Sequence, residues 1–335
     1  MTCSDILAST EQIDDYSVTA EKLCQLKATL QNNIVGQQNL INSMLICLLC
    51  DGHMLLEGMP GLAKTIATKA LSHGIEGQFH RIQFTPDLLP SDLIGTDILN
   101  LGNQEFTFKK GPIFQNVVLA DEVNRAPAKV QSALLEAMEE KQITVGQNSY
   151  KLPDLFMVLA TQNPIEQEGT YQLPEAQLDR FLMKVLLDYP SHDQELKILT
   201  LNEHRGSRHA ILDIEVTTQE EIFNARSAIR QIYIDEKLKN YIVSLVRATR
   251  NLGAYQKNLA KWLRFGASPR ASIALLECSK AWAWLCGARY VSPEHIQYVT
   301  PNILRHRILP SFEAQAEEVS VDQVIDELLK LVAIP

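Results

Sequence analysis

A glycine-containing turn that ends in a lysine and a threonine is the first segment with the residue types needed to bind phosphate. Residues 58–65 follow a predicted strand and open a predicted helix. In such a turn, backbone N–H groups and the helix N-terminus bind phosphate oxygens. The Lys64 amine can reach the terminal phosphates, and the Thr65 hydroxyl can ligate Mg²⁺. The residues of this predicted phosphate loop are Gly58, Met59, Pro60, Gly61, Leu62, Ala63, Lys64 and Thr65.

One position of the phosphate loop departs from the usual pattern GxxxxGK[ST]. Ala63 stands where the pattern has glycine, and a positive φ costs a residue with a Cβ about 1 kcal/mol or more. Ala63 therefore fits only if its φ is negative or nearly so. The alternative interpretation of this segment is an ordinary turn before a helix.

Two carboxylates end an apolar run further along the chain. Asp121 and Glu122 directly follow Val117–Ala120, which predicts a buried strand with acids at its tip. Asp121 would hold Mg²⁺ and Glu122 would act as general base for an attacking water. The alternative is a pair of solvated acids. Because the pair follows the phosphate loop with one predicted strand between them, we expect the two segments to bind and hydrolyse ATP.

Two polar residues further along fit the same chemistry. Asn163 ends the next predicted strand, where a parallel sheet would place it beside the acids and let it orient the water. By itself it is more often a turn residue before a proline. Arg180 precedes the fifth predicted strand and could reach the nucleotide of a neighbouring subunit. The alternative is a surface ion pair, worth about 1 kcal/mol or less.

Short apolar runs that alternate with helical patterns must position these residues. Such alternation predicts an α/β fold with a parallel five-stranded sheet in a three-layer αβα arrangement. The third and fourth runs are almost continuously apolar, which is typical of strands covered on both faces. The predicted strands are His53–Glu57, Phe79–Phe84, Asn116–Ala120, Leu155–Thr161 and Leu182–Asp188.

The rest of the chain is predicted to be helical. Strand signals fade after Pro190, and glycines and prolines then separate helical patterns. We predict an N-terminal helical segment at 1–33, an α/β nucleotide-binding domain at 34–190 and an all-helical lid domain at 191–335. The helices predicted after the boundary cover about 191–204, 218–231, 235–252, 268–286, 293–305 and 320–333.

The segment that contains the acids is also the part of the sequence with the strongest family resemblance. Ala120–Glu140 reads ADEVNRAPAKVQSALLEAMEE, which resembles the signature of the MoxR family of AAA+ ATPases. Pro60 and Ala63 resemble that family's variant phosphate loop. The similarity extends from about Ile34 to about Ile308 and implies an AAA+ P-loop core followed by a helical lid.

The resemblance implies further roles at matching positions. Val35 and Gly36 lie in a segment similar to the one that contacts the adenine. Asn163 matches the first sensor and Arg180 the finger that acts on a neighbouring subunit. Arg270 matches the second sensor, which the lid contributes to the nucleotide. For Arg270 the alternative is a helix-start arginine paired with a nearby acid.

The resemblance also implies a hexameric ring, Mg²⁺-dependent ATP hydrolysis, chaperone-like remodelling and a partner with a von Willebrand factor A-type domain. Hairpin-like segments at about 97–108 and 142–152 occupy positions where the family has insertions that face the ring's pore or top surface. The alternative is plain solvent-exposed hairpins.

Composition limits the other classes of function. The 335 residues contain 31 Lys and Arg against 40 Asp and Glu, a net charge of −9, which opposes binding of nucleic acid through bulk charge. Met44–Cys50, the longest apolar run, is far shorter than the ~20 residues of a membrane span. We expect no membrane span, no nucleic acid partner and a cytoplasmic location. The alternative functions are an ATP-gated scaffold with little turnover and a DNA-remodelling motor.

Overall fold

The structure is a computed structural model that describes residues 19–32, 34–59, 62, 64–100, 105–163, 170–204, 216–251, 253 and 261–335. The chain divides into two compact units. The first, here the α/β unit, contains Lys22–Phe181 and Val185–Glu221. The second, here the helical unit, contains Leu182–Lys184, Ile222–Pro335 and the chain up to Glu21. The domain limits predicted from the sequence stay predictions.

A five-stranded sheet forms the centre of the α/β unit, with the strand order β2-β5-β8-β1-β9. The pairs β2–β5, β5–β8 and β1–β8 are parallel, so the predicted α/β class is confirmed. β5 and β8 are buried along almost their whole length, as their apolar runs predict. The strands are β1 (Met54–Gly58), β2 (Phe79–Gln83), β5 (Val117–Asp121), β8 (Met157–Gln162) and β9 (Met183–Leu187).

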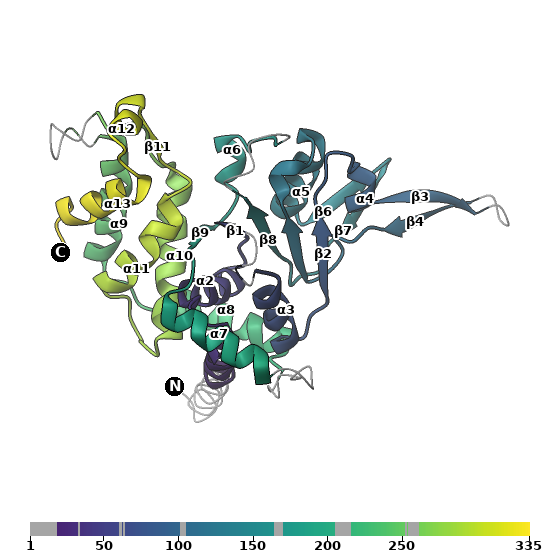
Figure 1. The fold of residues 1–335 in the computed structure, drawn as a ribbon, viewed down its shortest axis with the longest axis horizontal. Helices are drawn as coiled ribbons and strands as arrows, with labels where there is room; N and C mark the ends of the chain where they lie inside the picture. Colours follow the sequence, from purple (N-terminus) through teal and green to yellow (C-terminus); the bar gives the residue numbers. More distant parts are fainter. Residues whose placement is uncertain are drawn as a thin grey trace, which may run out of the picture. The chain divides into compact units, whose positions relative to one another are not determined.

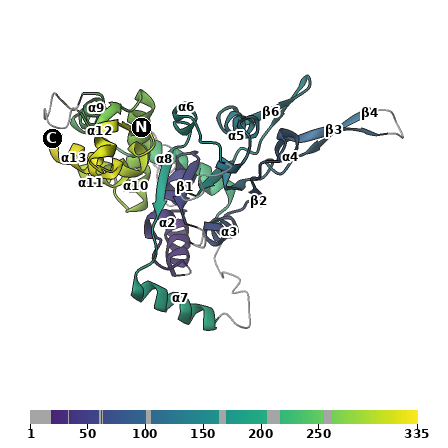
Figure 2. The same ribbon diagram turned by 45° about the horizontal axis from the view of Figure 1, so that its top comes forward.

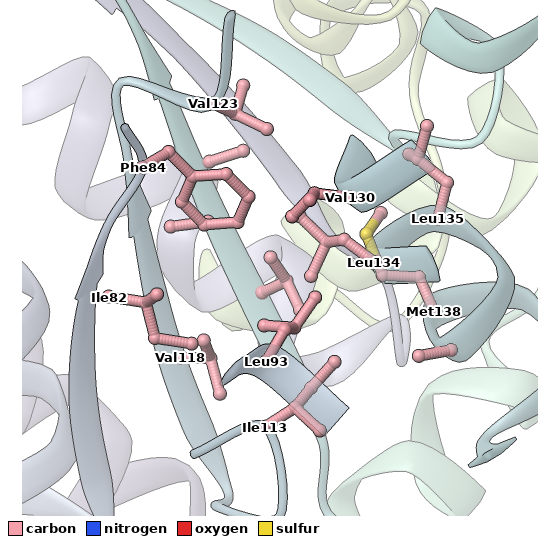
Figure 3. Close-up of a cluster of buried hydrophobic side chains, with 14 of the residues drawn as sticks. Ile82, Phe84, Leu93, Ile113, Val118, Val123, Val130, Leu134, Leu135 and Met138 are labelled. Atoms are coloured by element: carbon pink, nitrogen blue, oxygen red, sulfur yellow. The ribbon is translucent and has the colours of Figure 1, made fainter. Parts of the chain in front are cut away.

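Helices cover both faces of this sheet (Figure 1). Side chains of the strands, such as Ile82 and Val118, point toward α5 (Ala128–Glu140) and pack in one cluster with its Val130 and Leu134 (Figure 3). The opposite face is covered by α3 (Lys64–Gly74), which contacts β2 and β5, and by α2 (Gln38–Leu49). The result is the predicted three-layer αβα arrangement, with α5 fixed just after the strand that ends in the acids.

Two hairpins extend from the α/β unit, as predicted. β3 (Gly95–Asn100) pairs with β4 (Glu105–Lys110), and this hairpin projects away from the sheet (Figure 2). β6 (Gln142–Val145) pairs with β7 (Asn148–Lys151). The ring of Phe108 stacks on that of Tyr150 with centroids 4.0 Å apart, so the two hairpins contact each other.

Short elements and α7 complete the α/β unit. A helix over residues 19–32 belongs to this unit from Lys22 onward. Its Leu26 lies against Gly74 at the end of α3. The remaining elements are α4 (Pro90–Ile94), the 3-10 helix η1 (Val123–Arg125), α6 (Glu175–Leu178) and α7 (His192–His204).

The helical unit follows the predicted pattern closely, because its helices begin at strong signals. Ser268 and Ser320 cap the first turns of their helices through their hydroxyls. Pro269 and Pro293 are each the first residue of a helix in this unit. The short α12 and the β10–β11 pair were not predicted. The elements are α8 (Gln219–Gln231), which begins in the α/β unit, then α9 (Glu236–Arg250), β10 (Leu263–Phe265), α10 (Pro269–Leu285), α11 (Pro293–Leu304), β11 (Leu309–Pro310), α12 (Phe312–Ala316) and α13 (Val321–Leu331).

Among the helices that the structure describes, none combines the length and the apolar character required to span a bilayer.

Candidate functional site

The two acids lie where β5 ends. The strand is buried up to Ala120, and Asp121 is its last residue. Its neighbour β8 runs in parallel, so the carboxyl ends of both strands meet at one edge of the sheet, where ligands of such sheets bind. Thr161 of β8 donates a hydrogen bond from Oγ1 to Asp121 Oδ1 at 2.6 Å. The Glu122 N–H donates to the same hydroxyl oxygen at 2.9 Å, so Thr161 fixes both acids.

Glu122 adopts a left-handed backbone conformation, with φ 56° and ψ 50°. Such a conformation costs a residue with a Cβ about 1–3 kcal/mol and concentrates at functional sites. It turns the chain sharply from β5 into η1. The Glu122 Oε2 accepts a hydrogen bond from Gln83 Nε2 at 2.8 Å and another from Arg125 Nη1 at 3.0 Å. The carboxylate of the predicted base is therefore held by two donors at one of its oxygens.

Asp121 is held by an arginine from the neighbouring strand β2. Arg81 donates from Nε at 3.0 Å and from Nη2 at 2.5 Å, both to Asp121 Oδ2. The Nη2 group also donates to Gln83 Oε1 at 3.1 Å. Together with the contacts of Glu122, these bonds form a continuous row of side chains along the sheet edge.

Lys64 is the first residue of α3, as the sequence predicts. Its Nζ donates to the Gly58 carbonyl at 2.6 Å across the phosphate loop. Burial lowers the pKa of Lys64 below its ordinary value of 10.5, while the nearby charges of Asp121, Glu122 and Glu57 oppose that shift. The lysine is thus half-buried within electrostatic reach of both acids, which is the arrangement that phosphoryl transfer requires.

The rest of the phosphate loop is described only in part. A Cβ on Gly58 would lie 2.7 Å from the Cβ of Leu187 in β9, so this close approach favours glycine. Leu62 is buried, and Thr65 lies in the first turn of α3. The predicted contributions of Pro60, Gly61 and Ala63 lie outside the described residues.

The predicted adenine segment lines a cavity of about 610 Å³. Val35 and Gly36 form one wall, and Gln194 and Lys197 of α7 form another. Gly36 has φ +81°, which favours glycine, and it lies against the side-chain amide of Gln194. The cavity has the size that a small organic ligand needs.

Asn163 and Arg180 both lie in the α/β unit. Asn163 directly follows β8, which pairs with the strand of the acids. Arg180 follows α6, and its Nη2 lies 2.9 Å from Glu139 Oε2 of α5. It also lines a cavity of about 490 Å³ with Glu136 and Gln177 among its walls. Its side chain is 32 % exposed, so it is accessible from outside the unit.

Arg270 belongs to the helical unit. It is the second residue of α10, and its N–H donates to the hydroxyl of the cap residue Ser268 at 3.2 Å.

The sequence did not reveal the residues that hold the acids: Arg81, Gln83, Arg125 and Thr161. Arg81 and Gln83 are two apart on β2, so both side chains lie on the same face, but only the register of β2 against β5 places them beside Asp121. Thr161 is a buried residue of a largely apolar strand, so its sequence context predicts packing and not a contact with the acids. Arg125 is part of the signature stretch and could have been recognised as a residue one turn beyond Glu122.

The residues at the sheet edge fit a magnesium ion that also contacts phosphate. Within the described ranges, no group of three or more His, Cys, Asp or Glu residues could hold a metal. Mg²⁺ in nucleotide sites needs only one or two protein oxygens because phosphates and water supply the rest. Asp121 and Thr65 carry oxygen ligands of that kind.

Family comparisons agree with this geometry. Residues 53–183 match the family described as "ATPase family associated with various cellular activities (AAA)", and residues 257–328 match the "AAA lid domain". A crystal structure of a candidate ATPase from Cytophaga hutchinsonii superposes with a TM-score of 0.90 and 45% identity, covering 98% of this chain and 99% of that one. The fold and the site define an AAA+ ATPase with a helical lid.

Curated relatives specify the family. The chain is 43% identical to "Chaperone MoxR1" of Mycobacterium tuberculosis over 303 residues, which cover 90% of this chain and 79% of the relative. It is 44% identical to "Uncharacterized protein YeaC" of Bacillus subtilis, covering 90% and 91%. It is 31% identical to "Protein MoxR" of Paracoccus denitrificans, covering 92% and 95%. The chain belongs to the MoxR family of AAA+ ATPases, as the signature stretch indicated.

Proposed function

We propose that this ATPase hydrolyses ATP with Mg²⁺ at the interfaces of an oligomeric ring and uses the energy to remodel a partner protein. The observation that carries the proposal is the sheet edge, where Thr161 fixes both Asp121 and Glu122 within electrostatic reach of Lys64. A phosphate-binding lysine and two differently held carboxylates are the parts that water attack on a γ-phosphate requires.

Each residue then has a distinct task. Lys64 binds the terminal phosphates, and Thr65 and Asp121 supply oxygens to the metal. When bound, Mg²⁺ neutralises developing charge on the phosphates. Glu122 accepts the proton of the attacking water; its present donors, Gln83 and Arg125, both bind Oε2, and the carboxylate has further lone-pair sites for that water. Asn163 orients the water from the adjacent strand.

The residues further out recognise the rest of the nucleotide. The cavity beside Val35 and Gly36 receives the adenine. Arg270 senses the γ-phosphate from the helical unit. We propose residues 34–190 as the AAA+ domain and 191–335 as the lid.

Arg180 is proposed to act on the nucleotide of the neighbouring subunit. Its position in the α/β unit and its exposure support that role, since the side chain of an arginine finger must extend beyond its own subunit to reach a neighbour. We propose a hexameric ring, located in the cytoplasm, that acts on a partner with a von Willebrand factor A-type domain. The description of one relative as a chaperone supports the remodelling activity.

Mixing experiments test this function. Hydrolysis should require Mg²⁺, and the rate per subunit should rise with protein concentration. Arg180→Ala should retain nucleotide binding and lose about 10³-fold or more in hydrolysis, and mixtures with wild-type subunits should show rates that are not proportional to composition. Arg289→Ala, which removes an exposed arginine of the helical unit, is the matched control and should mix proportionally. Strictly proportional rates for Arg180→Ala would contradict action between subunits.

A further inference from the structure

Arg81 lies on β2 directly beside the predicted metal ligand. The register of the sheet pairs Gln83 with Asp121 and Arg81 with Leu119, so the Arg81 side chain extends along the strand to the carboxylate. Its Nε and Nη2 groups both donate to one oxygen, Asp121 Oδ2. Arginine hydrogen bonds to a carboxylate are among the stronger contacts in proteins.

Both oxygens of Asp121 are therefore engaged. Oδ2 accepts the two N–H groups of Arg81, and Oδ1 accepts the Thr161 hydroxyl at 2.6 Å. The Asp121 side chain is only 15 % exposed, which restricts the directions from which a cation can approach. A carboxylate has about four lone-pair sites, and a second cation at Oδ2 would meet the positive charge of the guanidinium. Arg81 and a divalent cation thus seek the same oxygen.

We propose that Arg81 is an internal counter-ion of Asp121 that competes with Mg²⁺ for Oδ2 and so lowers the affinity of the site for the metal. The inference rests on the proposed function, because it takes Asp121 as the metal ligand. It assigns to Arg81 a positioning role: it holds the carboxylate at the sheet edge and withdraws when the metal binds.

The surroundings of Arg81 allow that exchange. Its side chain is 49 % exposed, so it can move without unpacking the core. Gln83 Oε1 already accepts a bond from Nη2 at 3.1 Å and offers a second partner after the guanidinium leaves Asp121. Release of Arg81 therefore exchanges one solvated contact for another and leaves no buried charge behind.

Arg125 provides a matched comparison. It is 41 % exposed and binds Glu122, the acid that is not proposed to hold metal. Removing either arginine takes one positive charge from the same end of β5. Of these two arginines, only Arg81 touches Asp121, the proposed metal ligand, so direct competition can be separated from the general effect of charge.

The test is a magnesium titration of the full-length chain with a fluorescent, non-hydrolysable ATP analogue. Nucleotide affinity is measured in EDTA and then as Mg²⁺ is added, which gives the metal concentration at half-maximal effect. Arg81→Gln should lower this midpoint about three- to tenfold, the gain expected when a competing, half-exposed contact worth no more than an ordinary hydrogen bond is lost. Arg125→Gln should change it less than twofold, and Arg81→Lys should give an intermediate shift.

The remaining outcomes are decisive. A higher midpoint or no change in Arg81→Gln would overturn the inference, as would equal shifts in Arg81→Gln and Arg125→Gln. Nucleotide binding in EDTA shows that each variant is folded. Asp121→Asn distinguishes a failure of the proposed metal site from a failure of the role of Arg81. If it leaves the magnesium effect intact, the proposed function fails at Asp121; if it abolishes the effect while Arg81→Gln is silent, only the role of Arg81 fails.

Discussion

Arginines serve different purposes in the two units. At the sheet edge of the α/β unit, Arg81 and Arg125 are 49 % and 41 % exposed and bind the two carboxylates of the proposed chemistry. In the helical unit, Arg305 is 11 % exposed and binds Asp322 at 2.8 Å and the Lys184 carbonyl at 2.7 Å. Exposure and the presence of a backbone acceptor thus distinguish arginines that can exchange partners from arginines that also hold the backbone in place.

A second arginine of the helical unit has the same structural role. Arg307 donates to the Leu182 carbonyl at 3.0 Å and to the Ile303 carbonyl at 2.7 Å. With Arg305 it attaches residues 182–184, which belong to the helical unit, to the end of α11. Carbonyl oxygens that lose such donors stay unsatisfied when buried, so these contacts affect stability more than chemistry.

The largest expected effect on ligand binding is at Lys64 of the α/β unit. Lys64→Ala should weaken ATP binding about 30- to 5,000-fold, because truncating a partly buried charge that binds an oppositely charged group costs about 2–5 kcal/mol. Calorimetric titration with a non-hydrolysable analogue measures it. Lys69→Ala, an exposed lysine on the same helix, is the control and should bind normally. Binding within threefold of wild type in Lys64→Ala would remove the basis for the phosphate loop.

The helical unit should respond through stability instead. Arg305→Met should lower the free energy of unfolding by about 1.5–3 kcal/mol, because it leaves Asp322 and the Lys184 carbonyl without their donor, while ATP affinity stays within threefold. Denaturant unfolding gives the first quantity and calorimetry the second. Arg247→Met, at an exposed position of α9, is the control. A large loss of affinity with unchanged stability would erase the contrast between the units.

The smallest effect is a pH dependence at the start of α11. His295 Nδ1 accepts the Ser292 N–H at 3.0 Å, and burial lowers the pKa of His295 below 6.5, although Glu294 partly opposes the shift. The unfolded chain therefore binds the proton more readily, and stability is lost as pH falls below about 6.5. Because the ring is only partly buried, we expect a loss of no more than about 1 kcal/mol between pH 7.5 and 5.5, the contribution of the one hydrogen bond that Nδ1 accepts; denaturant unfolding measures it.

His295→Gln is the matching control for that dependence. Glutamine retains the capping box with Ser292 but does not titrate. The variant should lose this part of the pH slope and keep wild-type stability at pH 7.5. An unchanged slope would place the titrating group elsewhere.

The comparison also shows how far the sequence predicts the molecule. Helix starts in the helical unit follow from local signals such as Ser268 before Pro269, and the buried strands β5 and β8 follow from their apolar runs. The positions of Asp121, Glu122 and Lys64 at element ends were predicted for the same reason. Each of these features depends on residues close together in the sequence.

The contacts of the acids could not be predicted in this way. Arg81 meets Asp121 only because β2 pairs with β5 in one register, and Thr161 meets both acids only because β8 is the other neighbour. β2 is largely half-buried or exposed and shows no clear alternation of apolar residues. Strand order and register join residues that are about 40 positions apart, and no local pattern carries that information.

Glu122→Gln tests the central claim, that the sheet edge of the α/β unit is where ATP is hydrolysed, most directly. The substitution keeps the size of the side chain but removes the group that accepts the proton. Steady-state hydrolysis should fall about 10²- to 10⁴-fold, while binding of ATP with Mg²⁺ stays within threefold of wild type. Turnover at the wild-type rate in Glu122→Gln would contradict the account.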